Sequence, residues 1–183
     1  MADAFVRPAI ASDAPQIAQI QIQTWNIAYL GHVPDTVLRA SAASEELLSA
    51  QWRSAVVAPP TPAHRVLVAV EHTAQRADIV GFSASGPAGD DELPLPGAQT
   101  PLMVTTMLVE PRWGRRGHGS RLLAATVDLA RDSHCDAALI WLLERDVASR
   151  NFFTSAGWSP DGTVRTLDMD GVLVEEKRYV TYF

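Results

Sequence analysis

The sequence predicts one α/β domain, residues 1–183, in which helices flank a single mixed sheet, and three observations support this fold class. The predicted elements follow the order β, α, α, β, β, β, α, β, α, β, β, with no internal repeat and no break between domains. The continuous apolar run Ala137–Leu143 is typical of a central strand that is buried on both faces. Two final strands meet at Asp170-Gly171, a pair that favours a tight hairpin turn.

The individual elements are predicted from capping residues, turn residues and apolar periodicity. Ser12 or Asp13 caps a first helix that ends at Gly31, because both residue types are favoured at helix N-caps. Prolines in 58–62 end a second helix, since proline fixes φ and removes a hydrogen-bond donor. The predicted strands are 5–8, 65–71, 78–85, 102–109, 137–143, 164–169 and 172–182; the later helices are 35–57, 119–132 and 148–155, and 86–100 is a loop.

Composition and charge narrow the function classes. The apolar share of 47% and the charged share of 20% are ordinary for a soluble protein, and no apolar run approaches the roughly 20 residues that span a bilayer. A net charge of −6 argues against general affinity for nucleic acid. Residues 1–8 lack a basic stretch followed by an apolar core, so we expect no signal peptide and a cytoplasmic protein.

Cysteine usage gives no sign of a disulfide or a metal site. Cys135 is the only cysteine, which fits a reducing compartment. His134 precedes it, but no second Cys/His cluster stands at the spacing of zinc ligands. We therefore expect a buried structural thiol and no bound metal.

One segment, residues 107–123, has the features of a phosphate-binding strand, loop and helix. Glycines at 114, 117 and 119 allow unusual φ/ψ values and a close approach of the backbone to a ligand. The start of the following helix leaves N–H groups unpaired, and its dipole favours negative charge there. Arginines at 112, 115, 116 and 121 add positive charge to an acidic protein. The segment predicts a site for a pyrophosphate-bearing cofactor, and the alternative is a glycine-rich turn with solvated arginines.

Two common nucleotide-binding motifs do not fit this segment. Gly114 and Gly119 have the spacing of a P-loop, but Ser120 and Arg121 follow in place of Lys and Ser/Thr. A dinucleotide fingerprint would start at Gly117, but Leu122 stands where it needs a third small residue. Both motifs are therefore excluded.

Four sequence blocks, spread over nearly the whole chain, are informative together. They are Trp25-x-x-Ala28-Tyr29-x-Gly31-x-x-Pro34, Ile79-Val-Gly-Phe82, Val109-x-Pro111 followed by Arg115-Arg116-Gly117-His118-Gly119-Ser120-x-Leu122-Leu123, and Leu142-Leu143-Glu144-x-Asp146-x-x-Ser149-x-x-Phe152-Phe153-x-x-x-Gly157-Trp158. The third block resembles the acetyl-CoA signature [QR]-x-x-G-x-[GA] of the GCN5-related N-acetyltransferases (GNAT). The fourth is similar to that family's L-E-x-N-x-x-A-x-x-F-Y-x-x-x-G-F, and the first two are similar to its first-helix region in many bacterial members and to its third strand. The chain resembles a bacterial-type GNAT protein.

The resemblance implies a GNAT-like mixed, mostly antiparallel sheet in which two central parallel strands, here 103–109 and 137–143, splay apart around the pantetheine arm. It implies acetyl-CoA as co-substrate and no metal. By analogy Trp25 and Tyr29 line the acceptor cleft, and the alternative for both is ordinary packing of a helix face. Residues assigned to the cofactor are Met107, Leu108, Val109, Gly114, Arg115, Arg116, Gly117, His118 (through its main-chain amide), Gly119, Ser120, Asp146, Ser149 and Phe152.

The general acid departs from the family pattern. Phe153 stands where many relatives have a tyrosine that protonates the departing CoA. An alkyl thiol has a pKa of about 8.5, so the thiolate is a tolerable leaving group without that acid. Tyr29, Tyr179 and Tyr182 are the candidates to replace it.

The general base is also unusual. Met103 stands where many relatives carry a glutamate in the fourth strand. Glu144, at the end of the fifth strand, is the preferred candidate, acting through water, and the alternative is a solvated carboxylate. Weaker candidates are His32, Asp35 and the acidic run 90–92.

Two functions follow from these residues. The first is an N-acetyltransferase that moves the acetyl group of acetyl-CoA to a primary amine of a small molecule or peptide by direct attack, since no nucleophile for a covalent intermediate is evident. The second is a CoA-binding regulatory domain with little turnover, which Phe153 and the missing fourth-strand glutamate would explain. Members of the family often dimerise, so a homodimer is compatible with the resemblance.

Overall fold

The computed structural model describes residues 3–31, 33–72, 76–89, 92 and 94–183. The seven strands that it defines there form one mixed sheet in the order β1-β2-β3-β4-β5-β7-β6. Only the central pair, β4 with β5, is parallel, and each of the other neighbouring pairs is antiparallel. The strands are β1 (Asp3–Pro8), β2 (Arg65–His72), β3 (Ala77–Pro87), β4 (Pro101–Val109), β5 (Ala137–Leu143), β6 (Ser159–Met169) and β7 (Val172–Tyr182).

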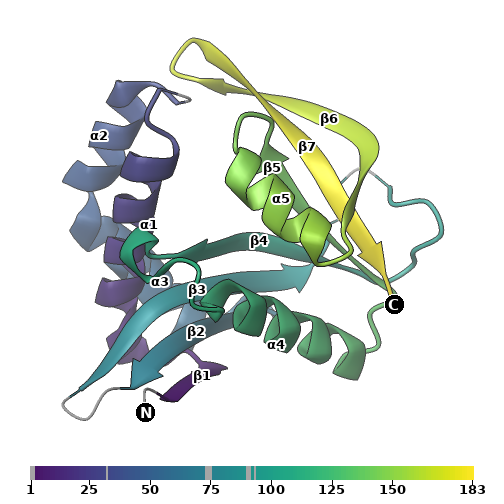
Figure 1. Cartoon of the computed structure of the whole chain (residues 1–183), viewed down its shortest axis with the longest axis horizontal. Helices are drawn as coiled ribbons and strands as arrows, with labels where there is room; N and C mark the ends of the chain where they lie inside the picture. The colour runs from purple at the N-terminus through teal and green to yellow at the C-terminus, as the bar shows by residue number, and fades with distance from the viewer. Residues whose placement is uncertain (1–2, 32, 73–75, 90–91, 93) are drawn as a thin grey trace.

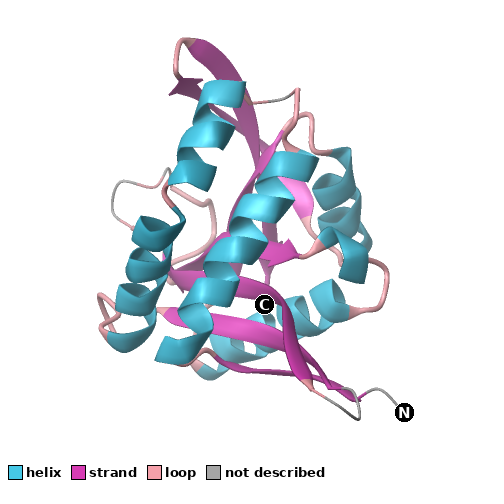
Figure 2. Cartoon of the chain, turned by 90° about the vertical axis from the view of Figure 1, so that its left-hand side faces the viewer, coloured by secondary structure: helices cyan, strands magenta, loops and turns pink. Residues whose placement is uncertain are grey.

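Helices cover both faces of this sheet (Figures 1 and 2). They are α1 (Ala14–Ala28), α2 (Asp35–Ala43), α3 (Glu45–Val57), α4 (His118–Asp132) and α5 (Val147–Ser155), with short 3-10 turns at Ala11–Asp13 and Pro111–Trp113. Alternation along β2 separates the two faces: Val68 and Val70 pack with α1 and α3, whereas Leu67 and Ala69 pack under α4. The predicted fold class is confirmed.

The predicted helix at 35–57 is two helices, α2 and α3. The break falls at Ser44, whose φ of −112° and ψ of 26° are not helical. Ser44 is the N-cap of α3, although its side chain makes no capping hydrogen bond there, and Glu45 and Glu46 suit the positive end of the dipole of α3. A serine followed by two glutamates was the sequence signal for this break.

Other boundaries differ by a few residues. β1 begins at Asp3, α4 at His118 and α5 at Val147, each one or two residues before its predicted start. β6 extends back to Ser159 because a bulge between Pro160 and Val164 lets it continue to pair with β7. The predicted turn between β6 and β7 is confirmed: Asp170 and Gly171 both have positive φ, 54° and 81°.

The centre of the sheet is open at one end. β4 and β5 pair from Pro101 with Ala137 to Val104 with Ile140, and the described pairing ends there. At the same level the β3–β4 ladder passes from Val104 to Thr106, so Thr105 is an extra residue in β4. A bulge of this kind bends a strand and increases its twist. β4 therefore diverges from β5 after Val104, as the resemblance implied.

Candidate functional site

The cofactor-side cleft lies between the start of α4 and helix α5, next to the diverging end of β4. It is a cavity of about 800 Å³, which is large enough for a sizeable ligand. Ten of the residues assigned to the cofactor in sequence analysis contribute to its lining: Met107, Val109, Gly114, Arg115, Gly117, His118, Gly119, Ser120, Ser149 and Phe152. The other three, Leu108, Arg116 and Asp146, lie outside this lining.

The turn before α4 is built on left-handed backbone. Gly117, the N-cap residue of α4, has a φ of 82°, and Arg115 has a φ of 63°. Glycine adopts this conformation without a steric penalty, whereas a side chain at Gly117 would be strained. A Cβ there would also lie 3.0 Å from Nη1 of Arg121. The glycine thus fixes the path that brings the chain into α4.

The first turn of α4 offers hydrogen-bond donors to the cleft. No side chain caps the helix, and Arg121 N is the first amide to bond back within it, to Gly117 O at 3.0 Å. The amides of His118, Gly119 and Ser120 precede that bond and have no acceptor within the helix. Gly119 also brings the helix close to Phe152, because a Cβ on this glycine would lie 3.4 Å from the Phe152 ring. Donors at a helix start suit a phosphate, so these residues fit a pyrophosphate group.

The imidazole of His118 is turned under the loop. It is buried, with Nε2 3.3 Å from Oε2 of Glu71 on β2 and the ring edge-on to Trp113 at 6.2 Å. Burial lowers the pKa of His118, and the charge of Glu71 offsets this only in part. The ring is thus enclosed by the core, where neither of its nitrogens has a hydrogen bond among the described residues, and the main-chain amide is the part of His118 that faces the cleft.

The arginines of the loop have separate surroundings. Arg115 lines the cleft, while Arg116 lies over the Trp113 ring at 4.8 Å from its centroid. Arg121 donates from Nη1 to Arg116 O at 3.1 Å, so its guanidinium supports the turn. Arg112 pairs with Glu110.

Helix α5 is held by the residue that replaces the family's usual asparagine. Asp146 is its N-cap, and its carboxylate accepts hydrogen bonds from Ser149 N at 3.0 Å and Ser149 Oγ at 2.7 Å. Asp146 therefore orients Ser149, which lines the cleft, and its own carboxylate is used in the cap.

A second cavity, the acceptor-side cavity, opens on the α1–α2 face of the sheet. Its volume is about 270 Å³. Trp25 and Tyr29 both line it, together with β4 at Thr105 and Thr106 and with β6 and β7. Both aromatic residues also pack against buried Leu143 and Val174, so packing and cavity lining coexist. Trp25 and Tyr29 thus both line a cavity and pack a helix face, so the two interpretations of these residues are compatible.

The two cavities meet where β4 and β5 diverge. Met107, Ser149 and Phe153 line both of them. Phe153 is buried and packs edge-on against Phe152 and Trp158, each at 5.2 Å between ring centroids. The two cavities therefore adjoin, and these three residues belong to the wall between them.

Of the three tyrosines proposed as acids, Tyr29 lines the acceptor-side cavity. Burial raises the pKa of Tyr29, and the charges of Asp146 and Glu176 raise it further. Its hydroxyl is therefore protonated at neutral pH but releases a proton reluctantly. The hydroxyl of Tyr179 accepts a hydrogen bond from Arg150 at 3.2 Å. The hydroxyl of Tyr182, the last residue of β7, donates a hydrogen bond to Pro96 O at 2.9 Å.

Glu144 does not contribute to the described lining of either cavity. Its Oε1 lies 2.6 Å from Nζ of Lys177, and this hydrogen bond holds the pKa of Glu144 below its usual range. Asp35 pairs with Arg39 on α2 at 3.5 Å. His32, Asp90 and Asp91 lie outside the described residues, and Glu92 binds Trp141. The carboxylate that lines the acceptor-side cavity is Glu176 on β7, which sequence analysis missed.

Comparison with known proteins decides the family. A model described as the acetyltransferase (GNAT) family matches residues 34–158, which is more than half of the chain. The chain belongs to this family. The GNAT match covers the whole loop and α4, and it ends at Trp158, where the fourth motif block ends.

Solved structures share the fold over nearly the full chain. NAA60 of Arabidopsis thaliana, in complex with a bisubstrate analogue, has a TM-score of 0.71 at 14% identity and covers 99% of both chains. A GCN5-related N-acetyltransferase from Rhodopseudomonas palustris has a TM-score of 0.68 at 18% identity, covering 97% of this chain and 94% of its own. PaiA N-acetyltransferase of Thermoplasma acidophilum, in complex with coenzyme A, has a TM-score of 0.67 at 12% identity and covers 99% of both. A search of curated proteins gave no match.

Three further features bear on the sequence predictions. In the described part of the chain, no helix is both long enough and apolar enough to cross a bilayer. Cys135 is half-buried, and burial raises the pKa of its thiol. Among the described residues, no three His, Cys, Asp or Glu side chains gather as a metal site.

Proposed function

We propose that this GNAT protein transfers the acetyl group of acetyl-CoA to a primary amine of a small molecule or peptide, by direct attack. The observation that carries the proposal is the pair of cavities that share Met107, Ser149 and Phe153 where β4 and β5 diverge. One cavity has amide donors suited to a pyrophosphate, and the other has apolar walls and a carboxylate. A thioester and an amine could meet between them.

The cofactor would be held mainly by backbone. The amides of His118, Gly119 and Ser120 would bind the pyrophosphate, with Arg115 adding charge, and β4 at Met107 and Val109 would bind the pantetheine. When bound, acetyl-CoA supplies an activated acetyl group. Coenzyme A as the ligand is supported by the likeness of the fold to PaiA of Thermoplasma acidophilum, whose structure is a complex with coenzyme A.

Transfer would need a neutral amine where the two cavities adjoin. The amine nitrogen would attack the acetyl carbonyl carbon, the carbon–sulfur bond would break with its electron pair going to sulfur, and the amine proton would pass to a base. Glu144 remains the proposed base, although its ion pair with Lys177 weakens it for this role. Phe153 gives the thiolate no proton, so the reaction would rely on the stability of the thiolate.

The test combines binding with turnover. Calorimetric titration of CoA measures occupation of the cofactor-side cleft, and thiol release from acetyl-CoA over a panel of primary amines measures transfer. We expect CoA binding and amine-dependent release. Failure to bind CoA would contradict the proposal entirely.

The second candidate is a CoA-binding regulatory domain without turnover. Phe153 at the usual tyrosine position and the ion-paired Glu144 favour it. CoA binding without thiol release on any amine would support this function over transfer. We retain the cytoplasmic location as part of either proposal.

A further inference from the structure

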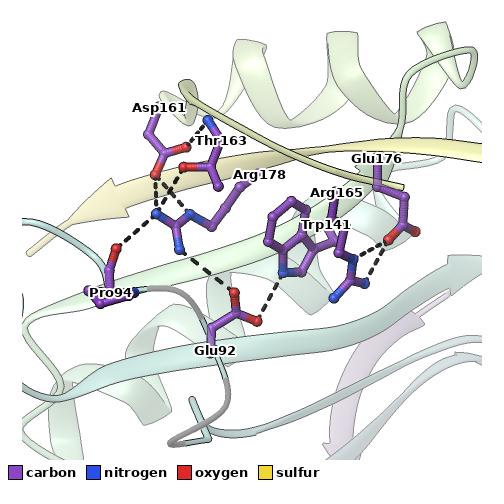
Figure 3. Close-up of polar contacts among 8 residues, drawn as sticks. All are labelled: Glu92, Pro94, Trp141, Asp161, Thr163, Arg165, Glu176 and Arg178. Atoms are coloured by element: carbon purple, nitrogen blue, oxygen red, sulfur yellow. Dashed lines mark hydrogen bonds and ion pairs between the residues drawn. The ribbon is translucent and has the colours of Figure 1, made fainter. Parts of the chain in front are cut away.

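A chain of polar and cation–π contacts links Arg178 to Glu176, two residues of β7 (Figure 3). Glu176 lines the acceptor-side cavity. The chain of contacts starts at Arg178, whose side chain is only 2% exposed. Its guanidinium bonds Asp161 at 2.7 Å and 2.8 Å, and its Nη2 donates to Thr163 Oγ1 and Pro94 O, each at 3.1 Å. Its Nη1 lies 3.7 Å from Oε1 of Glu92. Arg178 thereby ties the loop after β3 to β6.

The chain continues through Trp141 to Glu176. Trp141 Nε1 donates to Oε2 of Glu92 at 3.0 Å, which fixes the indole plane. Arg165 lies over that indole, 4.4 Å from its centroid, in cation–π geometry. The Arg165 guanidinium then reaches Glu176, with both Nε and Nη2 at 2.6 Å from the same oxygen, Oε2 (Figure 3). Arg165 is thus held by a ring on one side and a carboxylate at its tip.

This arrangement leaves the second oxygen of Glu176 available. Every contact described for the carboxylate uses Oε2, and among the described residues Oε1 has no hydrogen bond or ion pair. The side chain is 13% exposed, and it lines the acceptor-side cavity together with Trp141. Its charge is felt by Tyr29, another lining residue, because it helps to raise the pKa of that phenol. Glu176 therefore presents a negatively charged oxygen to a small, largely desolvated space.

The rest of the cavity is mostly apolar. Its walls include Trp25, Val33, Val37, Leu167 and Met169, and its volume is about 270 Å³. An ammonium group can pair with Oε1 of Glu176, whereas a second cation on the same molecule would be buried without a partner. A carboxylate on the acceptor would meet the like charge of Glu176, and Arg165 is already paired.

We propose that Glu176 is the acceptor-recognition residue and that the acceptor is a small primary amine on an uncharged, apolar body. Oε1 of Glu176 binds the amine as its ammonium ion, which gives up one N–H proton to the base through water before the nitrogen attacks, and the apolar walls bind the rest of the molecule. Arg165 and Trp141 are positioning residues that hold the carboxylate, and Glu92 and Arg178 hold Trp141. The inference rests on the proposed transferase function, whose amine it specifies.

The first experiment compares acceptors on the wild-type protein at saturating acetyl-CoA. The probes are 2-phenylethylamine and hexylamine as apolar monoamines, 1,6-diaminohexane as a dication, and phenylalanine as an amine with a carboxylate. We expect kcat/KM for the two monoamines to exceed that for the other two by about tenfold or more, the effect of one unpaired buried charge. A preference for the diamine or for phenylalanine would overturn the acceptor class.

The second experiment tests the residue. Glu176→Gln keeps an oxygen for Arg165 and removes the charge, and Glu46→Gln, on the exposed surface of α3, is the matched control. For Glu176→Gln we expect KM for 2-phenylethylamine to rise by about tenfold or more, with CoA affinity unchanged, because a charged hydrogen bond is lost. An unchanged KM would refute the role of Glu176.

A third measurement distinguishes a failure of the proposed recognition site from a failure of the proposed transferase function. Calorimetry of 2-phenylethylamine with the CoA-bound protein reports acceptor binding without turnover. Amine binding that is lost in Glu176→Gln supports the recognition site even if no thiol is released, and then only the transferase function fails. Thiol release that is insensitive to Glu176→Gln keeps the transferase function and overturns the recognition site.

Discussion

The two cavities that meet between β4 and β5 are built from different parts of the chain. The cofactor-side cleft is lined by two segments, 107–120 and 148–155, and the first of them carries Gly117 and the first amides of α4. The acceptor-side cavity gathers side chains from α1, α2, β4, β5, α5, β6 and β7. A backbone site is fixed by local sequence, whereas a site made of distant side chains can change its preference by single substitutions.

The largest expected effect is a loss of CoA binding in the cofactor-side cleft, with the acceptor-side cavity unchanged. Gly117→Glu places a side chain at a φ of 82° and a negative charge at the start of α4. We expect CoA affinity to fall by about 100-fold or more, equivalent to about 2.8 kcal/mol. Calorimetric titration with CoA measures this effect.

The matched control is Gly171→Glu, in the β6–β7 turn. Its φ of 81° gives the same backbone strain and the same added charge at a residue outside the described lining of the cleft. It should leave CoA affinity as in the wild type. Equal losses in both variants, or none in folded Gly117→Glu, would contradict the placement of the phosphate site.

A second effect concerns stability beneath the cofactor loop. His118 is buried and its pKa is lowered in the fold, whereas in the unfolded chain it is about 6.5. Below pH 6.5 the unfolded state binds a proton that the folded state does not, so the free energy of unfolding falls as pH falls towards the folded pKa. The slope is at most about 1.4 kcal/mol per pH unit. Above pH 6.5 this contribution is constant.

Urea unfolding at several pH values between 7.5 and 5 measures this slope. His118→Gln removes the titrating group, so the difference between the two pH curves isolates it. Parallel curves for the wild type and the variant would show that His118 titrates alike in both states.

A smaller effect concerns Phe153, one of the three residues that line both cavities. Phe153→Tyr restores the hydroxyl that many relatives carry, at the place where the two cavities adjoin. We expect kcat to rise by a few-fold, well below the roughly 10²–10⁴ of full general acid catalysis, because the thiolate already leaves tolerably. Steady-state thiol release measures it, with KM for acetyl-CoA as the internal control. A fall in kcat without loss of stability would argue against a missing acid.

The smallest effect concerns Arg116. Its guanidinium lies over Trp113 and is absent from the described lining of the cleft, so it acts on a bound phosphate only at a distance. Arg116→Ala should weaken CoA binding by about two- to threefold at low salt, and less at high salt, since exposed charges are screened. Titrations at two salt concentrations check this, and a loss as large as that of Gly117→Glu would mean that Arg116 contacts the phosphates directly.

Sequence reasoning predicted the cofactor side better than the acceptor side, for physical reasons. The turn at Gly117 follows from local backbone preference, and the strand Ala137–Leu143 from an unbroken apolar run. The break at Ser44 depends on a balance between helix propagation and capping that a periodic pattern does not resolve.

The acceptor side depends on strand register. Glu176 reaches the cavity because it pairs with Leu143 and lies on the same face of β7 as buried Val174. Register is a property of the assembled sheet, so no local motif marked Glu176. A signal did exist: alternation from Val174 places two charged residues, Glu176 and Arg178, on an inward face, which is unusual without a binding or pairing role.

The extra residue in β4, Thr105, has a kinetic consequence. It lies where the pairing of β4 with β5 ends, and the two cavities adjoin near this point through Met107, Ser149 and Phe153. Under the proposed function, each substrate would have a cavity of its own, so neither would have to bind before the other. An irregularity of one residue in a strand would then permit a random order of binding and release.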